Sequence, residues 1–115
     1  MKRVVITGMG ALSPLGNNLE ETWKNATNGV SGAKPITYFD SEKFRTQFAC
    51  ELKGFDPAGV LDRNEIKRSD AFTQYALYCA TEALTDSGLD LEKIDPFELG
   101  VIWGSGQGGM DTFEK

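Results

Sequence analysis

The sequence contains no histidine and only two cysteines among its 115 residues. Without an imidazole, the chain by itself has no Ser-His-Asp triad, no histidine general base and no histidine metal ligand. Cys50 and Cys79 are too far apart for a CxxC motif or a metal-ligand spacing, and a disulfide framework would need more cysteines. We therefore expect two reduced thiols in a reducing cytosol.

Long hydrophobic runs and an excess of positive charge are also missing. The apolar run Val4–Ile6 is far shorter than the ~7–15 residues of a signal-peptide core, and no window approaches the ~18 apolar residues of a membrane span. The 12 Lys and Arg stand against 17 Asp and Glu, a net charge of −5 that argues against a dedicated nucleic-acid binder or a polybasic membrane patch. These properties predict a cytoplasmic protein.

Three segments have the pattern of β-strands. The β-branched and apolar runs Arg3–Thr7 and Leu99–Trp103 predict strands that are covered on both faces, as in a parallel sheet. Alternation over residues 48–53 predicts a half-exposed strand that buries one side. The residues on that apolar side are Phe48, Cys50 and Leu52.

Two segments have the pattern of helices, which gives the chain an α/β order of strand, helix, strand, helix, strand. The first is predicted from Leu19 to Asn28, with Asn18 as N-cap, Glu21 completing a capping box, and Gly29 after its end. Its predicted apolar face consists of Leu19, Trp23 and Ala26. The second runs from Phe72 to Ser87 and is apolar over three turns, so it is predicted to be buried on most sides.

Two glycine-rich segments follow the predicted buried strands. Gly104–Gly109 formally matches GxGxxG, and Gly8–Gly10 matches it less well because Ser13 occupies the third glycine position. A dinucleotide site also needs an acidic residue about 20 positions further on, and neither segment has one. A small nucleotide-binding domain therefore stands as one hypothesis, beside ordinary turns at strand ends that glycine makes possible.

Three stretches are informative together: Val4–Gly10 with Ser13–Gly16, Asp70–Tyr75, and Gly104–Gly109. In combination they resemble the β-ketoacyl-carrier-protein synthases, most closely the type II enzyme of bacterial fatty-acid synthesis. The resemblance covers the whole chain and corresponds to about the N-terminal quarter of the family's subunit. It implies a thiolase-like layered α/β/α/β/α fold, of which residues 1–115 form the first part of the N-terminal half without an internal boundary. It also implies a homodimer.

The same resemblance implies decarboxylative condensation of malonyl-acyl carrier protein with an acyl thioester. The substrates are carried on the phosphopantetheine of acyl carrier protein, and no further cofactor is implied. This chemistry needs a cysteine nucleophile at a helix N-terminus and two histidines that stabilise the oxyanion. Neither Cys50 nor Cys79 has the neighbours of that nucleophile, so the chain supplies no catalytic residue and is expected to be inactive alone.

The end of the chain indicates a fragment, because Asp111–Lys115 looks like the opening turn of a helix. An acyltransferase segment is the leading hypothesis. A catalytically silent partner subunit, which keeps the pocket and dimer surfaces but lacks the nucleophile, is the alternative within the same fold.

A basic segment before the long helix matches the family's carrier-protein docking site. Its basic residues are Arg63, Lys67 and Arg68. Asn64 stands where the type II enzyme often has another lysine, so the patch is expected to be weaker here. The other interpretation is a solvated helix end whose charges pair with nearby acids. Those acids are Asp62, Glu65 and Asp70.

Two residues of the second glycine segment match positions that line the family's acyl pocket. They are Gln107 and Met110. The type II enzyme usually has a branched apolar residue where Gln107 stands, and a buried amide without partners costs roughly 1–3 kcal/mol. Gln107 is therefore expected either to alter the pocket floor or to point away from it into the dimer interface.

Overall fold

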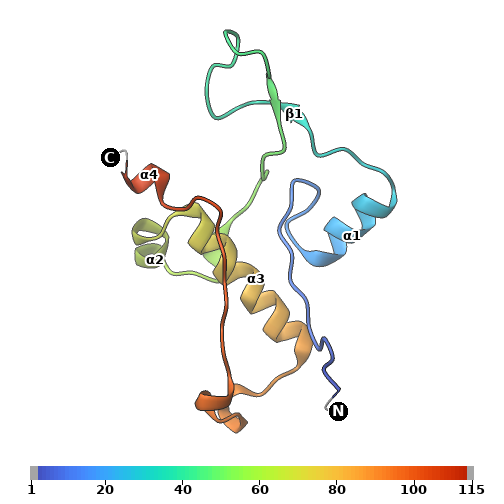
Figure 1. Ribbon diagram of the computed structural model, residues 1–115, viewed down its shortest axis with the longest axis vertical. Helices are drawn as coiled ribbons and strands as arrows, with labels where there is room; N and C mark the ends of the chain where they lie inside the picture. Colours follow the sequence, from blue (N-terminus) through green and yellow to red (C-terminus); the bar gives the residue numbers. More distant parts are fainter. Residues whose placement is uncertain (1–2, 114–115) are drawn as a thin grey trace. The chain divides into compact units, whose positions relative to one another are not determined.

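The computed structural model describes residues 3–113, which divide into two compact units (Figure 1). One unit, Ala11–Phe55, contains α1 (Leu19–Thr27), β1 (Lys34–Pro35) and β2 (Phe48–Ala49). The other unit joins the segment up to Gly10 to everything from Asp56 onward. Its elements are η1 (Pro57–Gly59), α2 (Arg63–Arg68), α3 (Ala71–Ser87), η2 (Leu91–Lys93), η3 (Pro96–Glu98) and α4 (Met110–Phe113).

Helix α1 begins where its local signals predict and ends one residue before the predicted end, with Asn28 as its C-cap. The Asn18 side chain accepts a hydrogen bond from the Glu21 N–H at 2.8 Å, and the Glu21 carboxylate accepts one from the Asn17 N–H at 3.1 Å. The reciprocal bond therefore reaches one residue further back than in the standard capping box. Gly29 follows the helix with φ of 69°.

The predicted apolar face of α1 is wrong, because Trp23 and Ala26 both face solvent. The helix instead turns polar side chains toward the preceding loop. Asn25 Nδ2 donates to the Leu15 carbonyl at 2.6 Å, and the Thr22 and Ser13 hydroxyls lie 2.9 Å apart. These hydrogen bonds satisfy loop backbone groups that hydrophobic contacts would leave unpaired, so they decide which face turns inward.

The predicted strand over residues 48–53 is shorter than expected and has the opposite phase. Strands β1 and β2 pair antiparallel over two residues each, with Lys34 opposite Ala49. Phe48 and Cys50 are exposed, whereas Glu51 is only 7% exposed. The inward position belongs to a carboxylate because its two oxygens have partners there: Thr37 Oγ1 donates to Oε2 at 2.7 Å and Thr37 N–H donates to Oε1 at 3.0 Å.

The hydrogen bonds from the Thr37 hydroxyl and backbone N–H hold the pKa of Glu51 below its ordinary value. A carboxyl group whose pKa is lowered in the folded state contributes stability at pH values above its unfolded pKa. That contribution is lost as the pH falls through the lower folded pKa.

We expect Glu51→Gln to lower the thermal unfolding midpoint of the protein near neutral pH, because an amide supplies one acceptor oxygen where two donors point. The difference from wild type should shrink at an acidic pH, as protonation of the native carboxyl group removes this contribution. Glu42→Gln, at an exposed position of the same unit, is the matched control. An equal difference at both pH values would show that the carboxylate charge is not what stabilises this contact.

The segment before Gly10 lies against the C-terminal half of α3 (Figure 1). A Cβ atom on Gly8 would come within 2.6 Å of the Ser87 nitrogen and would overlap the Ala83 carbonyl oxygen. The Met9 N–H donates to Asp86 Oδ2 at 2.9 Å. Glycine is required here because the backbone of the segment touches the backbone of the helix.

Helix α3 confirms the predicted second helix but not its burial. It ends at Gly88, which has φ of 64°, as the Ser87–Gly88 pair predicts. None of its residues is fully buried, and Leu77 faces solvent. Among residues 3–113, Leu61 is the one apolar side chain in the core, at 6% exposed, and both α2 and α3 pack against the neighbouring η1.

The two strands predicted to be covered on both faces are not strands in the described part of the chain. Arg3–Thr7 and Leu99–Trp103 form no sheet there, and Ile6 and Ile102 are 83% and 98% exposed. A strand exists only when a neighbour completes its hydrogen bonds, and between residues 3 and 113 neither run has one. The runs therefore keep the composition of buried strands without the surroundings that bury them.

Three smaller predictions concern the cysteines, the chain end and the membrane. Neither Cys50 nor Cys79 is in a disulfide. Helix α4 confirms a helical turn near residue 111, and Glu114 and Lys115 lie outside the described residues. In the part of the chain that the structure describes, no helix is long and apolar enough to cross a bilayer.

Candidate functional site

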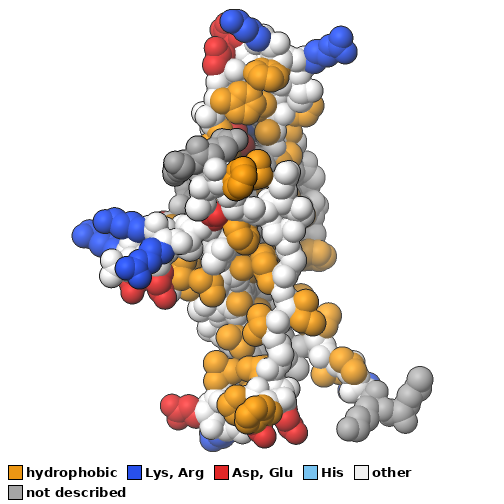
Figure 2. All heavy atoms as spheres, turned by 60° about the vertical axis from the view of Figure 1, so that its left-hand side comes forward, with side chains coloured by type: hydrophobic (Ala, Val, Ile, Leu, Met, Phe, Trp, Pro, Cys, Tyr) orange, Lys and Arg blue, Asp and Glu red, His pale blue; other side chains and the backbone are white. Residues whose placement is uncertain are grey.

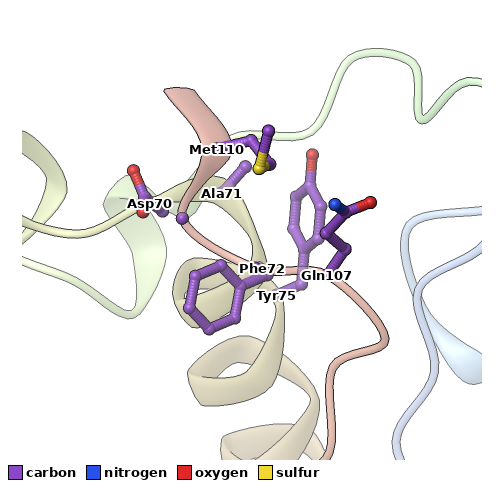
Figure 3. Close-up of a pocket in the computed structure, with 8 residues that line it drawn as sticks. Asp70, Ala71, Phe72, Tyr75, Gln107 and Met110 are labelled. Atoms are coloured by element: carbon purple, nitrogen blue, oxygen red, sulfur yellow. The ribbon is translucent and has the colours of Figure 1, made fainter. Parts of the chain in front are cut away.

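A cavity of about 250 Å³ lies between the first turns of α3 and the glycine segment that precedes α4 (Figure 3). The α3 side is formed by the helix start and two aromatic residues, and the other side is formed by the glycine segment and the first residue of α4. The lining residues are Asp70, Ala71, Phe72, Tyr75, Gln107, Gly108, Gly109 and Met110. The cavity thus joins two segments that are more than 30 positions apart in the sequence.

The backbone of the glycine segment lies close to α3, and this close contact shapes the cavity. A Cβ atom on Gly108 would meet the Phe72 ring at 3.0 Å, so the segment lies directly on that ring. Gly109 has φ of 75°, a left-handed conformation that favours glycine. The Thr112 hydroxyl then donates to Asp70 Oδ1, which attaches the start of α4 to the start of α3.

The structure brings the two predicted acyl-pocket residues to the same cavity. Gln107 and Met110 both line it, and Figure 3 shows the Gln107 amide beside the Tyr75 ring with Met110 above. Gln107 is exposed, so its amide reaches water at the cavity mouth and does not incur the cost of an unpaired buried amide.

The three predicted docking residues lie together on α2. Arg63, Lys67 and Arg68 are all exposed on α2, and Figure 2 shows a cluster of Lys and Arg side chains that projects from the surface. Asp62 caps the helix by accepting from the Asn64 N–H at 2.6 Å and the Glu65 N–H at 2.8 Å. Lys67 and Arg68 fall in the last turn, where the helix dipole favours positive charge.

The neighbouring acids do not form ion pairs with this cluster. Asp62 and Glu65 form a reciprocal capping box, in which Glu65 Oε2 accepts from the Asp62 N–H at 2.8 Å. Asp70 accepts from Thr112. Across residues 3–113 the ion pair that forms is Lys93 with Asp90, at 2.7 Å, so the pairing expected under the solvated-helix interpretation is not observed.

Two structural features were missed by reasoning from the sequence. The helical pattern predicts no partner for Gln74, but its amide bonds to two carbonyl groups at the end of α2. Asp70 was considered as a partner for the basic residues, but it bonds to Thr112, 42 positions away. No local pattern predicts either contact, because each joins elements whose approach depends on tertiary packing.

The described residues contain neither a candidate nucleophile site nor a metal site. Cys50 is exposed and directly follows β2, and Cys79 lies in the middle of α3, so neither is at a helix N-terminus, where a thiolate is stabilised. Within residues 3–113 no three His, Cys, Asp or Glu side chains gather as metal ligands would.

The first glycine segment does not have the geometry of a dinucleotide site. Gly8 and Gly10 have their open side filled by α3 backbone atoms of Cys79, Ala83 and Ser87. Furthermore, they face the C-terminal half of that helix, whose dipole disfavours phosphate. These glycines permit helix packing, which favours the structural interpretation of the segment.

Comparison with known proteins identifies the family. Residues 1–115 match the family model described as "Beta-ketoacyl synthase, N-terminal domain", and the chain therefore belongs to the β-ketoacyl synthase family. This confirms the resemblance found in the sequence.

The names of individual relatives are consistent with this family. The chain is 50% identical over 98% of its length to 3-oxoacyl-[acyl-carrier-protein] synthase 2 of Staphylococcus aureus (strain COL), of which it covers 27%. It is 48% identical over 99% of its length to the protein of the same name from Coxiella burnetii, of which it covers 28%. The chain thus spans about a quarter of the curated relatives it matches.

A solved structure confirms the fold class. The structure titled "The ishigamide ketosynthase/chain length factor" superimposes with a TM-score of 0.70 at 36% identity, over 78% of this chain and 22% of that one. The predicted thiolase-like ketosynthase fold is confirmed for the part that this chain spans.

Proposed function

We propose that this chain is the N-terminal segment of an acyltransferase of fatty-acid biosynthesis, a 3-oxoacyl-carrier-protein synthase. The observation that carries the proposal is the 50% identity to a synthase of that name over 98% of the chain. The reaction joins malonyl-acyl carrier protein to an acyl thioester. Loss of CO₂ from the malonyl group leaves a carbanion, which attacks the acyl carbonyl and expels the thiolate that held the acyl group.

In this proposal the segment binds the partner and shapes the pocket, and it performs no covalent step itself. Arg63, Lys67 and Arg68 attract the acidic carrier protein by complementary charge. Gln107 and Met110 form part of the wall against which the acyl chain lies. The enzyme is a cytoplasmic homodimer, its substrates arrive on phosphopantetheine, and no separate cofactor takes part.

The test of this proposal is a condensation assay of the full-length enzyme. With malonyl-carrier protein and an acyl thioester, we expect one 3-oxoacyl-carrier protein for each CO₂ released, and no product from the 115-residue chain alone. Failure of a full-length protein that carries a nucleophilic cysteine to form product would contradict the proposal.

A catalytically silent partner subunit is the second candidate, and the match to a ketosynthase/chain length factor structure is the observation that favours it. The two candidates differ in the rest of the coding sequence. An enzyme has a cysteine nucleophile followed by two histidines, whereas a silent subunit has that cysteine replaced and yields product only beside an active partner.

Gln107→Ile is expected to shift the chain-length profile of the full-length enzyme, because it replaces a hydrated amide at the cavity with a branched apolar side chain. Each additional buried methylene of an acyl chain gains about 0.8 kcal/mol, so a change of wall polarity should alter the relative kcat/KM for acyl groups of different length severalfold. Competition among acyl thioesters of graded length measures this ratio. Glu98→Gln, at an exposed position away from the cavity lining, is the control. Identical profiles for wild type and Gln107→Ile would remove Gln107 from the pocket.

A further inference from the structure

Gln74 connects the helix that carries the basic cluster to the helix that lines the cavity. It is the fourth residue of α3, at the end of the first turn, and is half-buried. Its Nε2 donates to the Ile66 carbonyl at 3.1 Å and to the Ser69 carbonyl at 2.9 Å. A side-chain amide nitrogen carries two hydrogens, so each carbonyl can receive one of them.

The position of α2 depends on such attachments. The helix has six residues, and a helix this short is marginal without tertiary contacts. Its last carbonyl groups also lack partners within the helix. The Ser69 hydroxyl donates to the Glu65 carbonyl at 2.6 Å, and Gln74 donates to the next carbonyl, that of Ile66. The C-terminal end of α2 is thus closed by one side chain of its own cap and one side chain of α3.

The same α3 segment reaches the cavity. Ala71, Phe72 and Tyr75 line it, and Tyr75 directly follows Gln74 in the chain. Gln74 binds the carbonyl groups of Ile66 and Ser69, and Lys67 and Arg68 are the two residues between these in the sequence. One side chain therefore attaches the turn that presents the positive charges to the helix that forms the cavity wall.

We propose that Gln74 is a positioning residue for carrier-protein docking: it holds α2 on α3, so that Lys67 and Arg68 meet the acidic carrier at a constant place relative to the cavity. This inference rests on the proposed docking role of the basic cluster. Gln74 does not line the cavity, and in this proposal it acts through the orientation of α2.

Gln74→Met is the most direct variant, because methionine is close in size and lacks both N–H donors. Gln74→Glu also removes the donors and places a negative charge beside two carbonyl oxygens, so its effects should be larger. Thr81→Met, at an exposed position of the same helix, controls for the introduction of a methionine. Both Gln74 variants are expected to speed hydrogen exchange in the α2 amides of the full-length enzyme, and Thr81→Met is not.

The kinetic test separates positioning from a general structural role. Gln74→Met should raise the apparent KM for carrier-bound substrate on the order of three- to tenfold, because two hydrogen bonds that orient the docking charges are lost. Turnover of a small thioester mimic, which needs no docking, should stay within about twofold of wild type. An equal loss on both substrates would overturn the proposal.

A double-mutant cycle distinguishes the failure of this inference from the failure of the proposed function. In a background with Lys67→Glu and Arg68→Glu, Gln74→Met should cause no further rise in KM, because the charges that it positions are gone. If the charge reversals raise KM and Gln74→Met does not, the docking role of α2 is supported and the proposed role of Gln74 is wrong. If the charge reversals themselves have no effect on KM, the docking role of α2 is wrong, and the role of Gln74 is wrong with it.

Discussion

Reversal of both charges in Lys67→Glu with Arg68→Glu is expected to raise the apparent KM of the full-length enzyme for carrier-bound substrate by on the order of tenfold or more at low ionic strength. The two side chains are exposed, and the nearby acids Asp62, Glu65 and Asp70 are engaged in other hydrogen bonds. The positive charge of the cluster is therefore not neutralised by an ion pair within residues 3–113. Because exposed charges are screened within a Debye length of ≈ 8 Å at physiological ionic strength, the effect should weaken as salt is added.

The control for this experiment keeps the change in net charge and moves it elsewhere. Lys43→Glu with Arg45→Glu alters two exposed residues of the other compact unit and changes the charge of the chain by the same amount. We expect this pair to leave KM for carrier-bound substrate near its wild-type value. A similar rise for both pairs, or an equal loss on a small thioester mimic, would show that α2 is not a specific docking site.

Gly10→Ala is expected to lower the free energy of unfolding of the full-length enzyme by about 1–3 kcal/mol or more, the usual cost of overpacking. The new Cβ atom would overlap the Cys79 carbonyl oxygen and would lie 3.0 Å from the Ala83 nitrogen. Both are backbone atoms inside α3, which cannot turn aside as a flexible side chain can. The segment before Gly10 must therefore move away from the helix, and its hydrogen bond from Met9 to Asp86 is strained or lost.

Gly59→Ala is the matched control for this substitution. A Cβ atom at Gly59 has open space around it, and the residue ends a 3₁₀ helix in the same unit. Surface substitutions of this kind usually change stability by no more than about 0.5 kcal/mol. Denaturant unfolding of the three proteins gives the comparison. Equal midpoints for Gly10→Ala and wild type would contradict the close backbone contact seen in the structure.

Local signals in the sequence were enough to place α1 and α3. Asn18 and Glu21 cap the first helix, and Gly29 and Gly88 follow the two helix ends with positive φ. Each of these contacts joins residues within a few positions of one another, so the free energy that favours it is present in the segment itself. Prediction from sequence succeeds at such sites because no distant partner is needed.

Burial could not be predicted from the same sequence. Ile6 and Ile102 have the composition of a covered strand and are exposed, since hydrogen-bonded neighbours are missing from residues 3–113. Glu51 lies inward where alternation predicts Cys50, because the donors of Thr37 satisfy its charge. A hydropathy pattern records what a residue prefers, and the partners present in space decide whether that preference is met.

The candidate site likewise contains some residues that the sequence predicted and others that only the structure revealed. Gln107, Met110 and the three basic residues were identified by resemblance to a family, and the structure brings the first two to one cavity and the others to one helix. Their chemical roles remain predictions. Gln74 and the contact between Asp70 and Thr112 were found only in three dimensions.

The sequence by itself determined the family, the approximate bounds of α1 and α3, and the absence of an imidazole from this segment of the chain. The tertiary structure alone decided that Gly8 and Gly10 serve close packing on α3, that Asp70 beside the basic cluster bonds to Thr112, and that one amide attaches α2 to α3. The physical reason for this division is how far apart in the sequence the interacting residues are. Caps and turns are settled within a few residues, whereas backbone contact, charge pairing and helix attachment depend on which distant segments meet.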